Sequence, residues 1–228
     1  MRLALALLVG LTGPAMAQEI VAARLIAPTD RYAHAVLGDA LEWGGLELTL
    51  SDARRLRFTL PDSHVFEDIT ARVGDFDGDG RAEVLVVETS LTHGAALAIY
   101  DTDGRRAATP YIGQPNRWLA PAGWGDFDGD GRIEIAYVDR PHLARELVFV
   151  RLTGDRLTEL ARAPGFTNHR IGDSAIAGGT RRCNARDTVV VASADWSRMM
   201  EVRLGSDAVI ATDIGPWPAQ GPDLTVCP

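Results

Sequence analysis

The octapeptide GDFDGDGR occurs twice in this chain, at residues 74–81 and again at residues 125–132. Each copy carries aspartates at alternate positions and is followed two residues later by a glutamate, Glu83 or Glu134. Self-similarity at a fixed period is typical of repeat architectures. The fold must therefore place the same acidic loop at two equivalent points.

Weaker copies of the same pattern extend the repeat along the chain. An apolar residue followed by Gly-Asp begins near residues 37, 73, 124 and 171, and the aspartates Asp39, Asp75, Asp126 and Asp173 lie 36, 51 and 47 residues apart. These intervals lie in or near the range of propeller blades. The first and last copies, GDALEWGG and GDSAIAGG, lack the acidic run. The pattern predicts four repeats, two of which carry the acidic loop.

Short runs rich in β-branched and aromatic residues follow each Gly-Asp pair, bounded by Gly, Asp and Pro. Such runs predict strands and hairpins. The clearest are LELTLSD, RLRFTLP, AEVLVVET, ALAIYD, IEIAYVD, ELVFVRL, RLTELA, DTVVVASAD, MMEVRLG and AVIATDI. We therefore predict an all-β fold, a small β-propeller of about four four-stranded blades. The N-terminal run EIVAARLIA is predicted to complete the last blade and close the ring, with a twisted sandwich as the alternative architecture.

The first residues and the composition bear on cellular location. Arg2, the apolar run 3–11 and Ala15-Met16-Ala17 are typical of a secretory signal peptide over residues 1–17, which leaves residues 18–228 as the propeller domain. The run is too short to span a bilayer, and no other segment is long enough. A net charge of −8 argues against a nucleic-acid partner. Basic residues are all Arg, which we interpret as the composition of a GC-rich bacterial genome. We expect a periplasmic or secreted bacterial protein.

The chain has two cysteines, Cys183 and Cys227. An even pair in an oxidising compartment predicts a disulfide, whereas a redox pair would require the CxxC spacing that is missing here. We expect a Cys183–Cys227 disulfide that holds the C-terminal end.

The acidic loops have the chemistry of a cation site. Counting from the first aspartate, positions 1, 3, 5 and 9 supply carboxylates, position 6 is a glycine that permits a sharp bend, and position 7 offers a backbone carbonyl. Such an all-oxygen donor set favours calcium over zinc or copper. The alternative is a pair of ordinary acidic turns. An EF-hand is excluded because position 12 is Val86 or Tyr137 and strands follow the loops.

The pattern D-x-D-x-D-G-x-x-[DE] leading into an apolar strand resembles the calcium loops of FG-GAP (VCBS-type) repeats, as in the propeller of integrin α subunits. The resemblance implies two Ca²⁺ ions held by Asp75, Asp77, Asp79, Glu83 and the Arg81 carbonyl, and by Asp126, Asp128, Asp130, Glu134 and the Arg132 carbonyl. Position 9 is Glu where the family usually has Asp, which predicts either a bidentate last ligand or a slightly enlarged loop. In this family such ions are usually structural.

The resulting prediction is an exported calcium-binding repeat protein that acts without catalysis, as an interaction or adhesion module for an unknown protein or glycan. The alternative is an exported hydrolase or lyase built on the same scaffold. GDSAIAG resembles the nucleophile block of GDSL-type hydrolases, with Ser174 as the nucleophile, but its place as the fourth repeat start explains it without chemistry. The five histidines are scattered in sequence, and Arg181-Arg182 is interpreted as a solvated loop.

Overall fold

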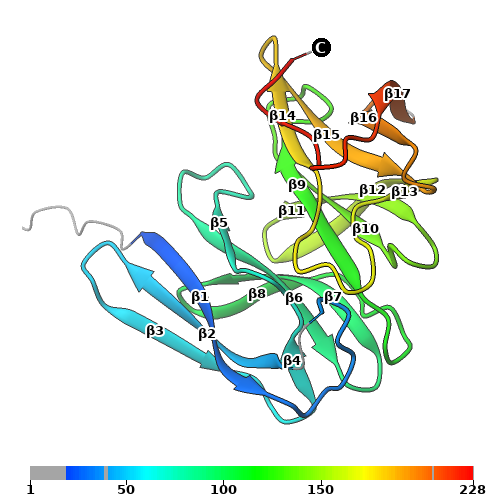
Figure 1. Cartoon of the computed structure of the whole chain (residues 1–228). Coiled ribbons are helices and arrows are strands. Elements are labelled where there is room, and N and C mark those ends of the chain that lie inside the picture. The colour runs from blue at the N-terminus through cyan, green and yellow to red at the C-terminus, as the bar shows by residue number, and fades with distance from the viewer. Residues whose placement is uncertain (1–18, 39–40, 207, 228) are drawn as a thin grey trace, which may run out of the picture.

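A computed structural model describes residues 19–38, 41–206 and 208–227. Within these residues the chain forms seventeen strands and no helix, which confirms the all-β prediction (Figure 1). The predicted signal peptide and Asp39 lie outside the described residues.

The first sheet has eight strands and contains the first two predicted repeats. Its hydrogen-bonded order is β1-β2-β4-β6-β7-β8, with β3 added to β2 and β5 added to β6. Strand β4 joins the two repeats because it pairs with β2 through Trp43 and Phe66 and with β6 through residues 64–66. The strands are β1 (Ile20–Thr29), β2 (Glu42–Leu50), β3 (Arg55–Thr59), β4 (His64–Phe66), β5 (Arg72–Gly74), β6 (Glu83–Ser90), β7 (Gly94–Asp101) and β8 (Gly104–Ala108).

The second and third sheets each correspond to one later repeat. The second is a four-stranded antiparallel sheet of order β12-β11-β10-β9, made of β9 (Leu119–Gly125), β10 (Glu134–Asp139), β11 (Glu146–Thr153) and β12 (Arg156–Pro164). The third has the order β13-β15-β16-β17 with β14 also paired to β15. Its strands are β13 (Phe166–Thr167), β14 (Gly179–Cys183), β15 (Arg186–Ser193), β16 (Arg198–Leu204) and β17 (Val209–Pro216).

Two details differ from the predicted propeller. The described residues form three sheets instead of four separate blades, because β4 connects the first two repeats by backbone hydrogen bonds. The N-terminal run was predicted to complete the last blade, and this was wrong: β1 pairs with β2 along nearly its full length. A short connection between neighbouring strands has a smaller loop-closure entropy cost than pairing across the whole chain.

The three sheets are stacked so that the second lies between the first and the third (Figure 1). Successive side chains of a strand point to opposite faces of its sheet. In β10, Ile135 and Tyr137 accordingly pack in a core shared with the first sheet, while Ala136 and Val138 pack in a core shared with the third. Burial on both faces explains why this strand is a continuous apolar run in the sequence. Stacking of this kind places both acidic loops at strand ends, where Phe76 and Phe127 pack into the cores and the loop aspartates lie outside them.

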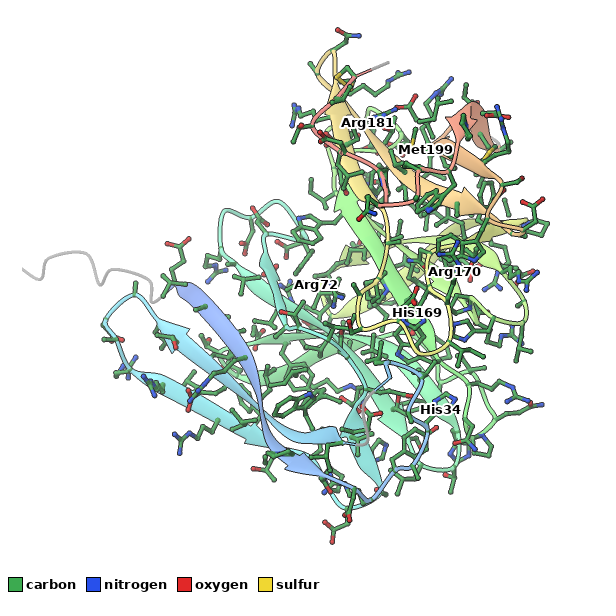
Figure 2. All side chains as sticks on the ribbon, in the orientation of Figure 1. His34, Arg72, His169, Arg170, Arg181 and Met199 are labelled. Atoms are coloured by element: carbon green, nitrogen blue, oxygen red, sulfur yellow. A yellow bond between two sulfur atoms is a disulfide. The ribbon has the colours of Figure 1, made fainter. Side chains whose placement is uncertain are left out.

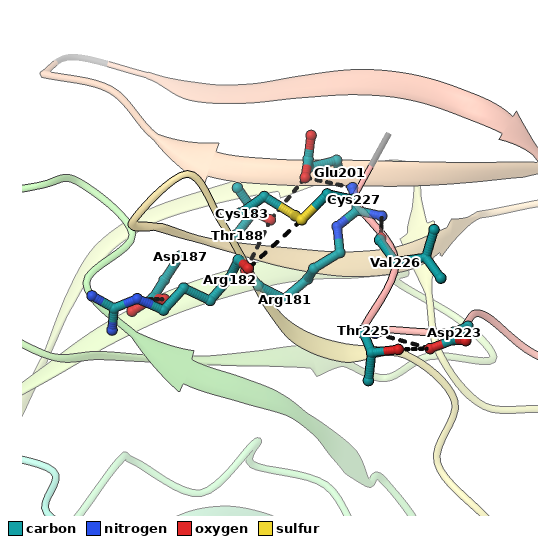
Figure 3. The surroundings of a disulfide bond; sticks show 10 residues. All are labelled: Arg181, Arg182, Cys183, Asp187, Thr188, Glu201, Asp223, Thr225, Val226 and Cys227. Carbon is teal, nitrogen blue, oxygen red and sulfur yellow. Dashed lines mark hydrogen bonds and ion pairs between the residues drawn. A yellow bond between two sulfur atoms is a disulfide. The ribbon is translucent and has the colours of Figure 1, made fainter.

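The disulfide between Cys183 and Cys227 is present and connects the end of β14 to the C-terminal segment (Figure 3). Arg181, also in β14, is 4% exposed, pairs with Glu201 and donates a hydrogen bond to the Val226 carbonyl at 3.3 Å. The interpretation of Arg181 as solvated was therefore wrong, since strand alternation turns it inward while Arg182 is exposed.

Candidate metal centres

The first acidic loop connects β5 to β6 and is held by its own carboxylates. Asp75 accepts hydrogen bonds from the backbone N–H of Gly78 at 2.7 Å and of Gly80 at 2.9 Å. Gly80 has a φ of +85°, a conformation that favours glycine. Glu83, the first residue of β6, accepts from the Phe76 N–H at 3.0 Å through Oε2. Position 9 is thus bonded to position 2, which closes the loop.

The second loop, between β9 and β10, has the same internal bonds. Asp126 accepts from Gly129 at 2.7 Å and from Gly131 at 3.0 Å, and Glu134 Oε2 accepts from the Phe127 N–H at 2.8 Å. The repeat in sequence is therefore a repeat in structure, down to single hydrogen bonds.

Each loop brings three carboxylates together. One oxygen from each lies within 4.8 Å of the others in two groups, Asp75, Asp77 and Glu83, and Asp126, Asp128 and Glu134. Oxygens on opposite sides of a calcium ion at about 2.4 Å are themselves about 4.8 Å apart, so this spacing fits Ca²⁺. The all-carboxylate donor set also suits a hard cation.

The fourth predicted carboxylate of each loop lies outside these groups. Asp79 accepts from the Arg81 backbone N–H at 2.8 Å and pairs with the Arg81 guanidinium at 2.9 Å. Asp130 and Arg132 make the same contacts at 2.8 and 2.7 Å. The hydrogen bonds from Arg132 lower the pKa of Asp130 to about 2. Metal ligation by these aspartates and by the Arg81 and Arg132 carbonyls stays a prediction.

The two position-9 glutamates are the most buried members. Glu83 is 3% exposed and Glu134 is fully buried. Burial raises the pKa of both, against the opposing effect of a backbone hydrogen bond and a nearby arginine. A buried carboxylate is more stable in its charged form when a cation is near. Since Oε2 of each is bonded to backbone, Oε1 is the oxygen best placed for a cation, which favours a monodentate contact over the bidentate one.

The structure also brings together histidines that are far apart in sequence. His142 Nε2 lies 3.0 Å from His169 Nδ1, and the Asp173 carbonyl lies 2.8 Å from His169 Nε2. His34, labelled in Figure 2, lies in the segment between β1 and β2. Its Nδ1 is hydrogen-bonded to the buried carboxylate of Glu67. These contacts span 27 and 33 residues, so spacing along the sequence gave no signal of them.

His34 and His142 border one cavity of about 300 Å³. Its walls come from four separate segments, and the cavity is lined by His34, Asn116, Arg117, Trp118, Arg140, His142, Leu143 and Ile171. Trp118 is buried and donates a hydrogen bond to the Glu67 carbonyl at 2.8 Å. Ser174 is exposed, between β13 and β14.

Comparison with known families supports the loop motif. No curated protein and no solved structure matched the chain. The family model described as FG-GAP-like repeat matches residues 72–137, a segment that runs from β5 into β10 and includes both acidic loops. The part of the chain that carries the two candidate metal centres is therefore similar to the FG-GAP-like repeat, as its motif predicted.

Proposed function

We propose that this chain is an exported, calcium-stabilised module of the β-propeller type that binds a protein or glycan partner without catalysis. In this proposal residues 18–228 form one domain, and each acidic loop binds one Ca²⁺ ion that fixes the strand pairing on either side of it. The similarity of residues 72–137 to the FG-GAP-like repeat supports an integrin-like module, and the partner-binding role is part of the proposal.

The proposal rests on one observation, that the same cluster of three carboxylates occurs in both loops. In each loop, one oxygen from each of three acidic side chains lies within 4.8 Å of the others, and the three side chains occupy the same loop positions. Exposed acidic turns are common, but repulsion among grouped carboxylates is costly where one of them is buried. A divalent cation removes that repulsion and stabilises the loop.

Export is supported by the disulfide, since such bonds persist in oxidising compartments. The described residues contain no helix long and apolar enough to cross a membrane.

The test is a thermal melt of the protein in chelator and in millimolar calcium, with an Asp77→Asn, Asp128→Asn double variant. We expect calcium to raise the Tm of the unchanged protein by several degrees, because a ligand at about 100 times its Kd contributes about 2.7 kcal/mol. The double variant should lose most of this rise.

Asp62→Asn is the matched control. It removes one negative charge from a fully exposed side chain outside both loops, so it should keep the calcium response. A calcium response equal in the double variant and in Asp62→Asn would show that the loops are ordinary acidic turns.

One observation favours the alternative, an exported hydrolase or lyase. The His34 imidazole is oriented by the Glu67 carboxylate at the edge of the cavity, an arrangement that can serve a general base. Hydrolysis of polysaccharide or phosphoester substrates that is lost in His34→Gln would establish this function. If the variant retained activity, the catalytic base would have to be a residue other than His34.

A further inference from the structure

An arginine from another strand reaches into each acidic loop. Arg106, in β8, places Nη2 at 2.6 Å from Asp77 and Nη1 at 3.0 Å from Glu83. Its guanidinium thus contacts the carboxylates at positions 3 and 9, two of the three that form the candidate metal centre.

Arg151, in β11, does the same in the second loop. Its Nη2 lies 2.9 Å from Asp128, and it donates to Glu134 Oε1 through Nε at 2.8 Å and also through Nη2. It also lies 3.1 Å from Asp130. Positions 3 and 9 again share one guanidinium.

The two arginines do not come from equivalent places. Arg151 is in the strand next to β10, whereas Arg106 is two strands away from β6, in β8. Copying of one repeat into the other therefore does not explain their common target. The same carboxylate pair receives a cation from two different backbone positions, which indicates a shared physical requirement.

That requirement is charge compensation. Glu83 and Glu134 are buried beside two further carboxylates, and a buried charge is stable only when it is paired. A guanidinium supplies a positive charge and several donors in a plane. We propose that Arg106 and Arg151 are resident counter-ions that keep the loops folded without metal, and that Ca²⁺ binds by displacing them. The second part rests on the proposed calcium function; the first does not.

The two loops differ in how easily the arginine can leave. Arg106 has another acidic neighbour, Asp155, at 3.5 Å, in the turn between β11 and β12 and outside the loop. Among the described residues, the carboxylates that pair with Arg151 all belong to the second loop, and its side chain is 10% exposed, against 17% for Arg106. When calcium displaces Arg151, its guanidinium is left buried without an acidic partner, whereas a displaced Arg106 can still pair with Asp155. Calcium should therefore fill the first loop at lower concentration.

The experiment measures calcium binding by calorimetry and Tm in chelator for Arg106→Gln and Arg151→Gln. Each variant should melt at lower temperature in chelator, because its loop loses the counter-ion. Each variant should also bind calcium at least about tenfold more tightly at the loop that its arginine contacts, which corresponds to about 1.4 kcal/mol of binding free energy. The gain should be larger for Arg151→Gln.

Arg54→Gln and Arg198→Gln are matched controls. These arginines lie outside both loops, are 55% and 46% exposed, and pair with Asp52 and Asp213. Exposed pairs contribute little, so calcium affinity should change by less than about fivefold.

The outcomes separate this inference from the calcium function. If neither the unchanged protein nor Arg106→Gln nor Arg151→Gln binds calcium, the calcium function fails, and the melts in chelator alone decide the counter-ion role. If all variants bind calcium equally, the function stands and displacement is refuted. Unchanged Tm in chelator refutes the counter-ion role. Should Arg151→Gln not fold in chelator, refolding on addition of calcium supports the proposal and failure to refold overturns it.

Discussion

The disulfide is expected to make a large contribution to the stability of the third sheet. Cys183 and Cys227 are 44 residues apart in sequence, and the closed loop contains all of β15, β16 and β17. In the chain-entropy model, a loop of about 45 residues loses about 13 cal/mol/K in the unfolded state, which corresponds to about 4 kcal/mol at 25 °C. Replacing both cysteines by serine should lower the free energy of unfolding by about this amount.

The folded contacts of the C-terminal segment are expected to survive the replacement. Val226 accepts from Arg181, and a Cβ built on Gly179 would lie only 2.9 Å from Leu224, which shows how closely the segment follows β14 (Figure 3). The change should therefore act on the unfolded state, with little loss of native structure.

Urea unfolding followed by tryptophan fluorescence measures the effect. With a slope of about 2 kcal/mol/M, the midpoint should fall by about 2 M. The unchanged protein in reductant is the control and should match the double serine variant. A loss below about 1 kcal/mol in both would refute the entropic argument, because the segment would then restrict the chain equally without the bond.

Two further predictions concern pH and packing. Burial, with smaller effects of neighbouring histidines, lowers the pKa of His142 to about 4, below the ordinary value of about 6.5. The unfolded state then binds more protons between these values, so stability should fall by up to about 3 kcal/mol as pH drops from 6.5 to 4. Urea titrations at several pH values should show that the unfolding free energy of His142→Asn depends less on pH than that of the unchanged protein. His93 is exposed, and His93→Asn should keep the pH dependence of the unchanged protein. Phe127→Ala removes a ring that is 1% exposed and packs on the second sheet, so it should lower the unfolding free energy by about 3–5 kcal/mol. Leu160 is exposed, and Leu160→Ala should lower it by less than about 0.5 kcal/mol.

The sequence predicted the long strands because burial leaves a clear pattern in them. Strands β6 and β10 are apolar on both faces, and their runs stand out between Gly and Asp residues. Strand β9 was not predicted, since LAPAGWG contains a proline and two glycines, which weaken a strand pattern. Strand β4 has only three residues, too few for any periodicity. That short strand joins the first two repeats, so the sheet count could not follow from patterns alone.

The grouping of the loop carboxylates depends on local spacing, which the sequence shows, whereas metal ligation by them stays a prediction. The grouped carboxylates lie within nine residues of one another in each loop, and the turn chemistry of Asp and Gly determines their approach. The arginine partners lie 23 and 29 residues from the first loop's carboxylates and 17 and 23 from the second's. Long-range pairs of this kind depend on strand register, which the sequence does not state.

The glutamate at position 9 is matched to the arginine that reaches into each loop from another strand. The Cα position of Glu83 is fixed by its pairing with Gly74 in β5, and that of Glu134 by its pairing with Gly125 in β9. From this position each glutamate bonds the backbone at position 2 with Oε2 and a guanidinium with Oε1. Aspartate is one methylene shorter, so at the same Cα it could not reach both partners. The longer glutamate side chain therefore places Oε1 within reach of the guanidinium, and the proposed charge compensation of the loop depends on both residues.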